Sequence, residues 1–389
     1  MSLLALYVFL GAAALVAYVV LGYPIALGLL SRLRSADPVR GEWTPQAVSV
    51  LLAVRNGEQW IRAKLETVLA LDYPRPLLQV LVLDDGSTDR TCEIAAEFKD
   101  RGVQVLSLPA RSKAAALNAG IERATGDVLF FTDVRQRLDR AALRYLTEDL
   151  CDPTIGVASG ELVILDGETQ QEADIGVYWR YEKWIRKRLS RLGSVMGATG
   201  SIYAMRRNLA SPIPADMLVD DMFLPISAFT KGYRVIFDER ARAFDNPTAL
   251  GQEFRRKVRT LAGNYQIVRC FPHLLLPTHG MWFHFVSHKL GRLMLPFALL
   301  AIACATPWLP PAVRAIAWLA QLAVYGLAAL DGVLPENTPL KRLSSPARTF
   351  VVLMAAAFVA ASILLPGRRE FWQPTGVDTP ADASSAIPH

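Results

Sequence analysis

The chain has 389 residues, enough for one large domain or two smaller ones together with membrane segments. Apolar residues make up 52% of it and the mean hydropathy is +0.25, values that are high for a soluble protein. The net charge is a modest +6. The four cysteines and five histidines are scattered without metal-ligand spacing, which argues against a disulfide scaffold or a zinc-binding module.

The first membrane-length segment lies at the N-terminal end. Residues 3–30 carry no charge, and this run is long enough to cross a hydrocarbon core of ~30 Å, so a transmembrane helix is expected over residues 1–31. A secretory signal peptide is the alternative, but no basic region precedes the run. Arg32, Arg34 and Arg40 follow at once, which places the central region on the cytoplasmic side of the cell (inner) membrane.

Short apolar runs alternate with helical patterns in a cytosolic domain that we expect over residues 45–272. The expected strands are Val48–Val54, Leu78–Leu83, Val103–Leu108 and Val128–Thr132. The expected helices between them are 58–70, 88–101 and 113–124, the last two capped near Ser87 or Thr88 and at Ser112. This alternation predicts an α/β fold with a mostly parallel sheet, in which ligands bind beyond the carboxyl ends of the strands.

The rest of the domain and the C-terminal region are less regular. A strand near 155–165 precedes helices expected at 170–192, 219–231 and 251–271. An aromatic segment over 273–292 is predicted to lie at the membrane interface, and residues 293–367 are predicted to form about three transmembrane helices. The tail over 374–389 is rich in Pro, Ala and Ser and is predicted to be disordered.

Polar side chains follow the first two expected strands. Arg55, Asn56 and Glu58 come after the first strand, and the pair Asp84–Asp85 ends the second. Because the carboxyl ends of parallel strands meet at one edge, these groups are expected in a single crevice, where they could contact the base, ribose and diphosphate of a nucleotide. A strand-ending turn with a helix cap is the alternative for the acidic pair.

Asp133 ends the fourth expected strand. A buried apolar strand that ends in Asp places a carboxylate on the floor of the crevice, where it can bind a divalent cation that bridges two phosphates. Lys113, at the start of helix 113–124, could meet the same diphosphate. An Asp that caps the next helix and a solvated lysine are the alternatives.

Two further groups of charged residues complete the candidate site. Asp220 and Asp221 begin the helix expected at 219–231, where acids commonly interact with the helix dipole, but two adjacent carboxylates also allow one to act as a general base. The last helix carries cations that suit a diphosphate because a guanidinium is always charged and bidentate. Its donor-side candidates are Gln252, Arg255 and Arg256.

Residues 178–192 combine six cations and one acid with aromatic residues, among them Trp179 and Trp184. This pattern predicts an amphipathic helix that lies in the plane of the membrane and contacts its lipids, with core aromatics as the alternative. Nucleic acid could also bind such a patch, but it requires more assumptions, so no nucleic-acid partner is expected. A turn that contains Gly200 and Ser201 follows this helix.

Together these motifs resemble family 2 inverting glycosyltransferases of the GT-A fold. The resemblance is strongest to the membrane branch that contains cellulose synthase catalytic subunits, hyaluronan synthases and exopolysaccharide glycosyltransferases. It covers about Val48 to Gln266, and the stretch from Lys113 to Gly120 resembles the family's Lys-x-x-Ala-Leu-Asn-x-Gly pattern. It implies a Rossmann-like cytosolic domain with flanking transmembrane helices.

Carried over by position, the resemblance implies that Asp85 contacts the nucleotide base, Asp133 holds the metal and Asp221 is the general base. The neighbouring and donor-side positions that also match are Asp84, Asp220, Gln252, Arg255 and Arg256. Two departures stand out. The Asp-x-Asp motif reads Asp133-Val134-Arg135, and the Trp of Gln-x-x-Arg-Trp is Arg256. The first removes a metal carboxylate, and the second weakens the case for a processive synthase.

The implied enzyme is a glycosyltransferase of the hexosyltransferase type that uses a UDP- or GDP-linked sugar and Mg²⁺ or Mn²⁺. Its acceptor would be a lipid-linked saccharide or a growing exopolysaccharide or capsular polysaccharide. The acceptor would enter from the membrane side past Gly200, Ser201 and the basic helix with Trp179 and Trp184. Proteins of a polysaccharide assembly system would be partners. A processive synthase that also exports its polymer is one alternative. A non-catalytic membrane scaffold that retains the fold is another, supported by the altered Asp-x-Asp motif.

Overall fold

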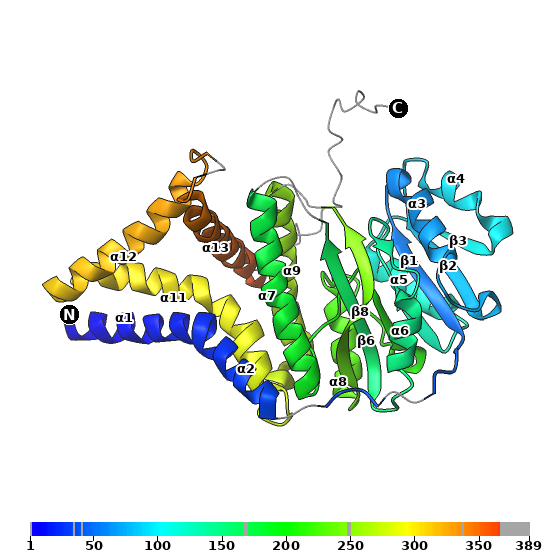
Figure 1. The fold of residues 1–389 in the computed structure, drawn as a ribbon, viewed down its shortest axis with the longest axis horizontal. Helices are drawn as coiled ribbons and strands as arrows, with labels where there is room; N and C mark the ends of the chain where they lie inside the picture. Colours follow the sequence, from blue (N-terminus) through cyan, green and yellow to red (C-terminus); the bar gives the residue numbers. More distant parts are fainter. Residues whose placement is uncertain are drawn as a thin grey trace.

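A computed structural model of the chain describes residues 2–33, 36–39, 42–165, 170–246, 250–335 and 338–365. A layered sheet domain lies at one end of the molecule and an arm of long helices at the other (Figure 1). Two helices, α7 (Gln170–Leu192) and α9 (Leu250–Cys270), stand between these parts. The expected tail over 374–389 lies outside the described residues.

Among the described residues, one sheet of eight strands has the order β3-β2-β1-β4-β7-β6-β8-β5. The strands β1 to β4 pair in parallel, β7 is antiparallel to both of its neighbours, and β6 runs parallel to β8. Their bounds are β1 Val48–Val54, β2 Leu78–Asp85, β3 Val103–Leu108, β4 Val128–Phe131, β5 Arg137–Leu138, β6 Ile155–Ile164, β7 Tyr203–Arg206 and β8 Arg234–Asp245. This arrangement confirms the expected α/β class with a mostly parallel first half.

Helices cover both faces of the sheet, which explains why its strands are continuously apolar. Val50 and Leu52 of β1 belong to a core cluster with α3 (Glu58–Leu69), α4 (Thr91–Ala96) and α6 (Ala142–Asp149). Leu51 points to the other face and packs in a cluster with α7, α5 (Lys113–Arg123) and α8 (Asp220–Thr230). The alternation along one strand therefore fills two separate cores.

Two elements differ from the expectations. The predicted helix 88–101 is the shorter α4, because Ser87 and Thr88 bind the neighbouring loop instead of capping it: the Asn56 backbone N–H donates to Ser87 Oγ (2.9 Å) and the Thr88 N–H donates to Asn56 Oδ1 (2.8 Å). The long strand β8 has no counterpart among the expected strands. Its alternation is hidden by charged residues such as Arg240, which pairs with Asp238 at 2.7 Å.

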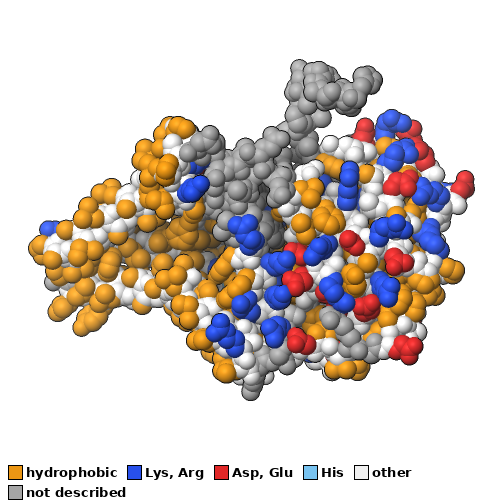
Figure 2. Space-filling model, viewed as in Figure 1, with side chains coloured by type: hydrophobic (Ala, Val, Ile, Leu, Met, Phe, Trp, Pro, Cys, Tyr) orange, Lys and Arg blue, Asp and Glu red, His pale blue; other side chains and the backbone are white. Residues whose placement is uncertain are grey.

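Within the described part of the chain, four helical segments are long and apolar enough to cross a membrane. They are Leu3–Leu33, Trp282–Trp308, Pro311–Leu330 and Lys341–Leu364. They contain α1 (Ser2–Ala17), α2 (Tyr23–Leu33), α10 (Trp282–His284), α11 (Gly291–Ala305), α12 (Pro311–Leu330) and α13 (Lys341–Ala360). Figure 2 shows apolar side chains covering the arm built from these helices, whereas charged side chains are spread over the sheet domain.

The segment expected at the membrane interface, 273–292, is divided in the structure. Its first part contains a short 3-10 turn, Pro272–Leu275. From Trp282 onward it is helical and continues through a π-helical stretch, Phe285–Leu290, into α11. The second apolar helix therefore starts about ten residues earlier than the expected start at residue 293, and it brings His288, Lys289 and Arg292 close to the sheet domain.

The approach of β4 to β1 gives a test of this packing. A Cβ on Gly126, just before β4, would lie 2.6 Å from the Ser49 backbone nitrogen. We therefore expect Gly126→Ala to lower the free energy of unfolding by about 1–3 kcal/mol, as overpacking in a core does. Thermal unfolding in detergent would measure the change. Gly326→Ala is the matched control, since a Cβ there meets nothing within 4 Å; equal losses in both variants would contradict the close approach.

Candidate active site

Three charged side chains from separate elements meet beyond the carboxyl end of β4. The Lys113 ammonium, at the start of α5, donates to Asp133 Oδ1 at 2.9 Å and lies 3.3 Å from Asp220 Oδ2. Lys113 and Asp133 are 37% and 38% exposed, so solvent and ligands reach this pair, whereas Asp220 is 10% exposed. Burial opposes the charge of Lys113, but the carboxylates of Asp133, Asp220 and Asp221 outweigh it and raise the lysine pKa.

Local sequence explains how Lys113 is presented. Ser112 caps α5 as expected, because its hydroxyl accepts from the Ala115 backbone N–H at 3.1 Å. The Ser112 hydroxyl also donates to the Ala215 carbonyl oxygen at 3.0 Å, which ties the start of α5 to the loop before α8. The helix that carries Lys113 and the helix that begins with Asp220 are thus fixed to each other by a contact outside the ion pairs.

Asp221 differs from its neighbour in its surroundings. Its backbone carbonyl accepts from the Ala198 N–H at 2.7 Å, which joins the start of α8 to the Gly-rich turn. A Cβ on Gly200 would lie 2.9 Å from Asp221 Oδ2, so the backbone of Gly200 packs directly against this carboxylate and leaves no room for a side chain. Burial raises the pKa of Asp221 to about 6; Asp220 adds to the shift and Lys113 opposes it. Such a carboxylate is suited to accept a proton near neutral pH.

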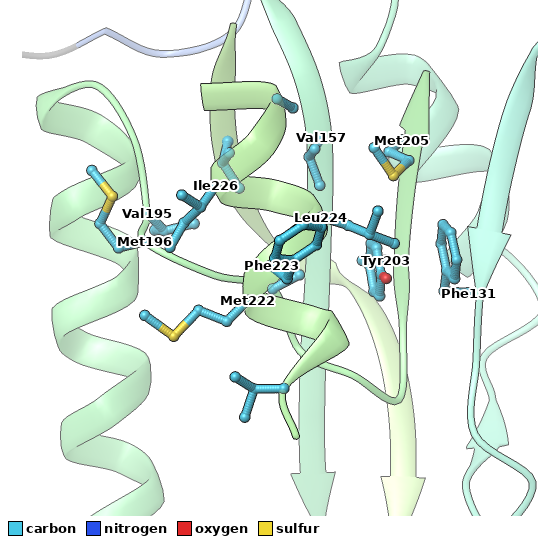
Figure 3. Close-up of a cluster of buried hydrophobic side chains, with 14 of the residues drawn as sticks. Phe131, Val157, Val195, Met196, Tyr203, Met205, Met222, Phe223, Leu224 and Ile226 are labelled. Carbon is cyan, nitrogen blue, oxygen red and sulfur yellow. The ribbon is translucent and has the colours of Figure 1, made fainter. Parts of the chain in front are cut away.

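A buried polar floor lies beneath these acids. Tyr203 of β7 stacks on Phe131 of β4 with ring centroids 4.5 Å apart, and Figure 3 shows the Tyr203 ring between Leu224 of α8 and Phe131. The hydroxyls of Tyr203 and Ser201 are buried and find no hydrogen-bond partner among the described residues. Burial raises the pKa of Tyr203, as do the nearby site acids. Because unpaired buried hydroxyls are costly, water or a ligand group is expected at this floor.

Lys64 of α3 supports the loop that carries Asp133. It is 1% exposed, and its ammonium donates to Thr132 Oγ1 at 2.6 Å and to the Gln136 carbonyl at 2.7 Å. The Thr132 hydroxyl then donates to the Ser201 carbonyl at 2.8 Å. Burial lowers the pKa of Lys64 to about 7, and Asp133 opposes this shift. One buried lysine therefore couples the Asp133 loop to the Gly200–Ser201 turn.

The residues expected to bind the nucleotide lie in two loops that are joined by hydrogen bonds. Glu58 accepts from the Arg90 N–H at 3.0 Å, and Asn56 binds Thr88 as described above. Asp84 accepts from the Ser87 N–H at 3.2 Å, and Asp85 accepts from the Arg111 N–H at 2.8 Å. Asn56 and Glu58 thus shape the crevice wall, while both acids are buried at the strand end, as their position predicted.

The residue that replaces the second acid of the Asp-x-Asp motif is turned toward another acid. Arg135 Nη2 donates to Asp245 Oδ2, at the end of β8, with a separation of 2.5 Å. Gln136 Nε2 donates to the same oxygen at 2.7 Å. Asp245 is 3% exposed at its side chain and is thereby neutralised. Arg135 therefore joins the loop after β4 to the end of β8. Lys113, and not Arg135, is the cation in contact with Asp133.

The side chains at this site can bind a divalent cation only if a substrate supplies further oxygen ligands. Among the described residues, no three His, Cys, Asp or Glu side chains lie close enough to hold a metal ion together. Asp133 offers one partly exposed carboxylate. Mg²⁺ commonly binds through one or two carboxylates plus substrate phosphates and water, so Asp133 and a diphosphate would suffice. The site therefore fits a cation that binds together with a substrate diphosphate.

The remaining predicted residues are distributed more widely. Arg55 is half-buried beside the two loops, Arg255 is exposed on α9 and Arg256 is half-buried there. The side chains of Gln252 and Trp179 lie outside the described residues. Trp184 is not beside the acids: it packs on α2, where a Cβ on Gly28 would lie 3.6 Å from its ring.

Sequence reasoning missed Arg186 as a site residue. Its guanidinium donates to Thr199 Oγ1 at 2.6 Å, next to Gly200, and its charge lowers the pKa of Asp221 against the effect of burial. The expectation that 178–192 serves the membrane as a whole is therefore too simple, because one face of α7 supports the carboxylates. The helical spacing of Glu182, Arg186 and Leu189 is the signal that could have separated the two faces.

Comparison with known proteins agrees with this geometry. Residues 49–213 match the family model described as Glycosyl transferase family 2. The probable glycosyltransferase YdaM of Bacillus subtilis (strain 168) is 26% identical over 240 residues, covering 58% of this chain and 56% of that protein. Poly-beta-1,6-N-acetyl-D-glucosamine synthase of Staphylococcus epidermidis is 25% identical over 231 residues, covering 57% and 56%. The chain thus matches little more than half the length of these relatives.

A solved structure extends the likeness to nearly the whole chain. Mannosyltransferase PcManGT from Pyrobaculum calidifontis, in complex with GDP-Man and Mn2+, matches with a TM-score of 0.72 at 23% identity, covering 92% of this chain and 99% of that one. At this identity the likeness establishes the fold. Over residues 49–213 the chain is therefore similar to glycosyl transferase family 2, on a GT-A fold that is flanked by helices of membrane-spanning length.

Proposed function

We propose that the protein is a membrane-embedded inverting glycosyltransferase that moves a sugar from a nucleotide sugar to an acceptor hydroxyl. The observation that carries this proposal is the Asp221 carboxylate, which lies against Gly200 and whose pKa burial raises to about 6. It is next in sequence to Asp220, which belongs to the ion-pair chain Asp133–Lys113–Asp220. A base, a diphosphate-binding cation and a metal carboxylate are thereby gathered at one sheet edge, which is what inverting sugar transfer requires.

In the proposed reaction Asp221 accepts the proton of the acceptor hydroxyl. The acceptor oxygen bonds to the anomeric carbon while the bond from that carbon to the donor phosphate oxygen breaks, so the configuration inverts and a nucleoside diphosphate leaves. Lys113 and the exposed Arg255 are the cations available to the departing diphosphate. A divalent cation held by Asp133 and the diphosphate would neutralise charge on the leaving group when bound.

The buried acids and the linked loops supply the donor pocket. Asp85 and Asp84 end β2 beneath the loops that contain Asn56 and Ser87, so a base and ribose inserted there would meet fixed polar groups. The names of YdaM and the N-acetylglucosamine polymer synthase support nucleotide-sugar chemistry, and PcManGT is named with GDP-Man. We keep UDP- and GDP-linked sugars as donor candidates on these grounds.

The acceptor is proposed to enter past the Gly200–Ser201 turn from the membrane side. The π-helical stretch Phe285–Leu290 and α7 lie between that turn and the apolar helices: Arg292, which pairs with Glu182 of α7, also lies 3.2 Å from His288. A lipid-linked saccharide or a growing polysaccharide fits this entrance. With Arg32 at the end of the first apolar helix, the positive-inside rule supports a cytoplasmic catalytic domain in the cell (inner) membrane.

A processive synthase remains the second candidate, and its support is the named activity of the polymer-forming relative. The Arg256 departure and the four candidate spans favour single additions, because a conduit for a polymer needs a wide helical wall. Product length measured by mass spectrometry separates the two. A non-catalytic scaffold would release no nucleoside diphosphate from any nucleotide sugar in a donor panel.

The role of Asp221 can be tested by an isosteric change. We expect Asp221→Asn to lower transfer about 10²–10⁴-fold, the usual effect of losing a general base, with donor affinity nearly unchanged. Nucleoside diphosphate release and donor titration by calorimetry would measure the two quantities. Asp216→Asn removes an exposed acid just before α8 and is the control. Near-normal turnover of Asp221→Asn would transfer the role to Asp220.

The charge of Lys113 should control the pH dependence of the reaction. In the parent enzyme kcat/KM is expected to fall below a pH of about 6 as Asp221 becomes protonated. Lys113 lowers the pKa of Asp221, so Lys113→Met should move this acid limb to higher pH, whereas Lys113→Arg should leave it nearly in place. An acid limb that stays fixed in Lys113→Met would mean that another group takes the proton.

Metal binding should depend on the donor. Because Asp133 is the single open carboxylate beside Lys113, we expect saturable Mn²⁺ binding only when a nucleoside diphosphate is present, and none in Asp133→Ala. Calorimetry and manganese electron paramagnetic resonance would measure this, with Asp100→Ala as a control at an exposed acid. Tight Mn²⁺ binding by the protein alone would mean that Asp245 leaves Arg135 to complete a site.

A further inference from the structure

A basic groove lies between α2 and α7, on the side of α7 opposite to the carboxylates. It has a volume of about 790 Å³. Its floor is formed by Gly28 and Trp184, and Glu239 is the acid in its wall. The cations that line it are Arg32, Arg180, Lys183, Lys187, Arg188 and Arg191. Figure 2 shows Lys and Arg side chains gathered at this junction between the apolar arm and the sheet domain.

Only part of this positive charge is balanced by acids. Lys187 pairs with Glu239 at 2.6 Å and Lys183 pairs with Glu161 at 2.6 Å. Arg32, Arg180 and Arg188 have no carboxylate within 4 Å among the described residues. Three guanidinium groups therefore line the groove without a carboxylate partner, an arrangement that favours binding of an anion.

Arg188 is the cation whose orientation in the groove is best defined. Its guanidinium lies over the Trp184 ring at 3.7 Å from the centroid, which fixes its orientation. Its Nε is buried and has no hydrogen-bond partner in the described part of the chain. Burial lowers the pKa of Arg188, and the charges of Arg32 and Arg191 lower it further. Arg188 lines the groove and is half-buried, so an anion there would relieve this repulsion and accept hydrogen bonds from its guanidinium.

The groove continues into an apolar hollow toward the membrane-length segment. A second space of about 310 Å³ shares Gly28, Arg32 and Trp184 with it and is otherwise lined by Pro24, Ile25 and Leu29. Ile25 and Leu29 are 62% and 55% exposed, and both belong to the candidate span Leu3–Leu33. The combined surface is polar and cationic at one end and apolar at the other.

We propose that this groove binds an anionic phospholipid of the bilayer, with its phosphate on Arg32, Arg180 and Arg188 and its acyl chains along Ile25 and Leu29. The amphiphilic shape selects this occupant over a soluble anion, which would leave the apolar end uncovered. Its position at the end of a candidate span places the phosphate at head-group level. The site is separate from the proposed acceptor entrance, because Arg186 and Glu182 face the other side of α7.

The test uses the full chain in detergent and native mass spectrometry with added phosphatidylglycerol or phosphatidylcholine. We expect phosphatidylglycerol to be retained selectively. Each cation near an anionic surface contributes roughly a fivefold factor in affinity, so the combined change Arg32→Gln, Arg180→Gln and Arg188→Gln should weaken binding at least about tenfold. The control triple, Lys99→Gln, Arg123→Gln and Arg207→Gln, removes equal charge from exposed sites elsewhere and should bind normally.

Several results would overturn the proposal. An equal loss of phosphatidylglycerol binding in both triple variants would mean that net charge, not this groove, determines binding. Equal retention of phosphatidylcholine would mean that the lipid contact is not selective for an anionic head group. Displacement of phosphatidylglycerol by millimolar inorganic phosphate or pyrophosphate would identify a soluble-anion site instead. Thermal unfolding controls for folding; if the triple unfolds, Arg180→Gln alone, at an exposed position, should still weaken phosphatidylglycerol binding severalfold. Because the readout is lipid binding, the result is independent of sugar transfer.

Discussion

The candidate site depends on one cation held between two acids. Lys113 joins the start of α5, the end of β4 and the start of α8 through Asp133 and Asp220, three elements that come from distant parts of the sequence. Without that ammonium the carboxylates would repel one another across a partly buried space, and the helix that carries Asp221 would lose its electrostatic support. The same ammonium is the cation proposed to contact a substrate diphosphate. Lys113 would therefore both stabilise the fold at this site and contact the nucleotide-sugar donor.

The two adjacent acids acquire different roles from their surroundings. Asp220 points to Lys113 and is in an ion pair, whereas Asp221 lies against Gly200 and has a raised pKa because of burial. Two titratable neighbours in unequal environments are the usual basis for assigning one to charge balance and the other to proton transfer. Glycine at position 200 fits this arrangement, since a Cβ there would lie 2.9 Å from Asp221 Oδ2.

The strands that end in acids could be predicted, because continuous apolar runs followed by Asp84–Asp85 and Asp133 are local features. The partners of those acids could not. Lys64 lies 68 positions from Thr132, and Arg135 lies 110 positions from Asp245. Because local sequence patterns do not report such distant contacts, neither pair could be predicted. The family pattern anticipated two carboxylates around a metal. The structure instead shows the second position used to neutralise a buried acid, a substitution that only the three-dimensional pairing explains.

The helix α7 shows why a strongly charged segment is packed next to apolar helices. A helix that is polar on all sides needs partners on several faces to be stable, and α7 has them. Arg186 reaches the turn beside Asp221, Glu182 pairs with Arg292 of the second apolar helix, and Trp184 packs against α2. A displacement of α2 or of the second apolar helix would therefore move Arg186 relative to Gly200. The same 23-residue helix lines the basic groove, so α7 is the element that connects the groove to the Gly200 turn beside Asp221.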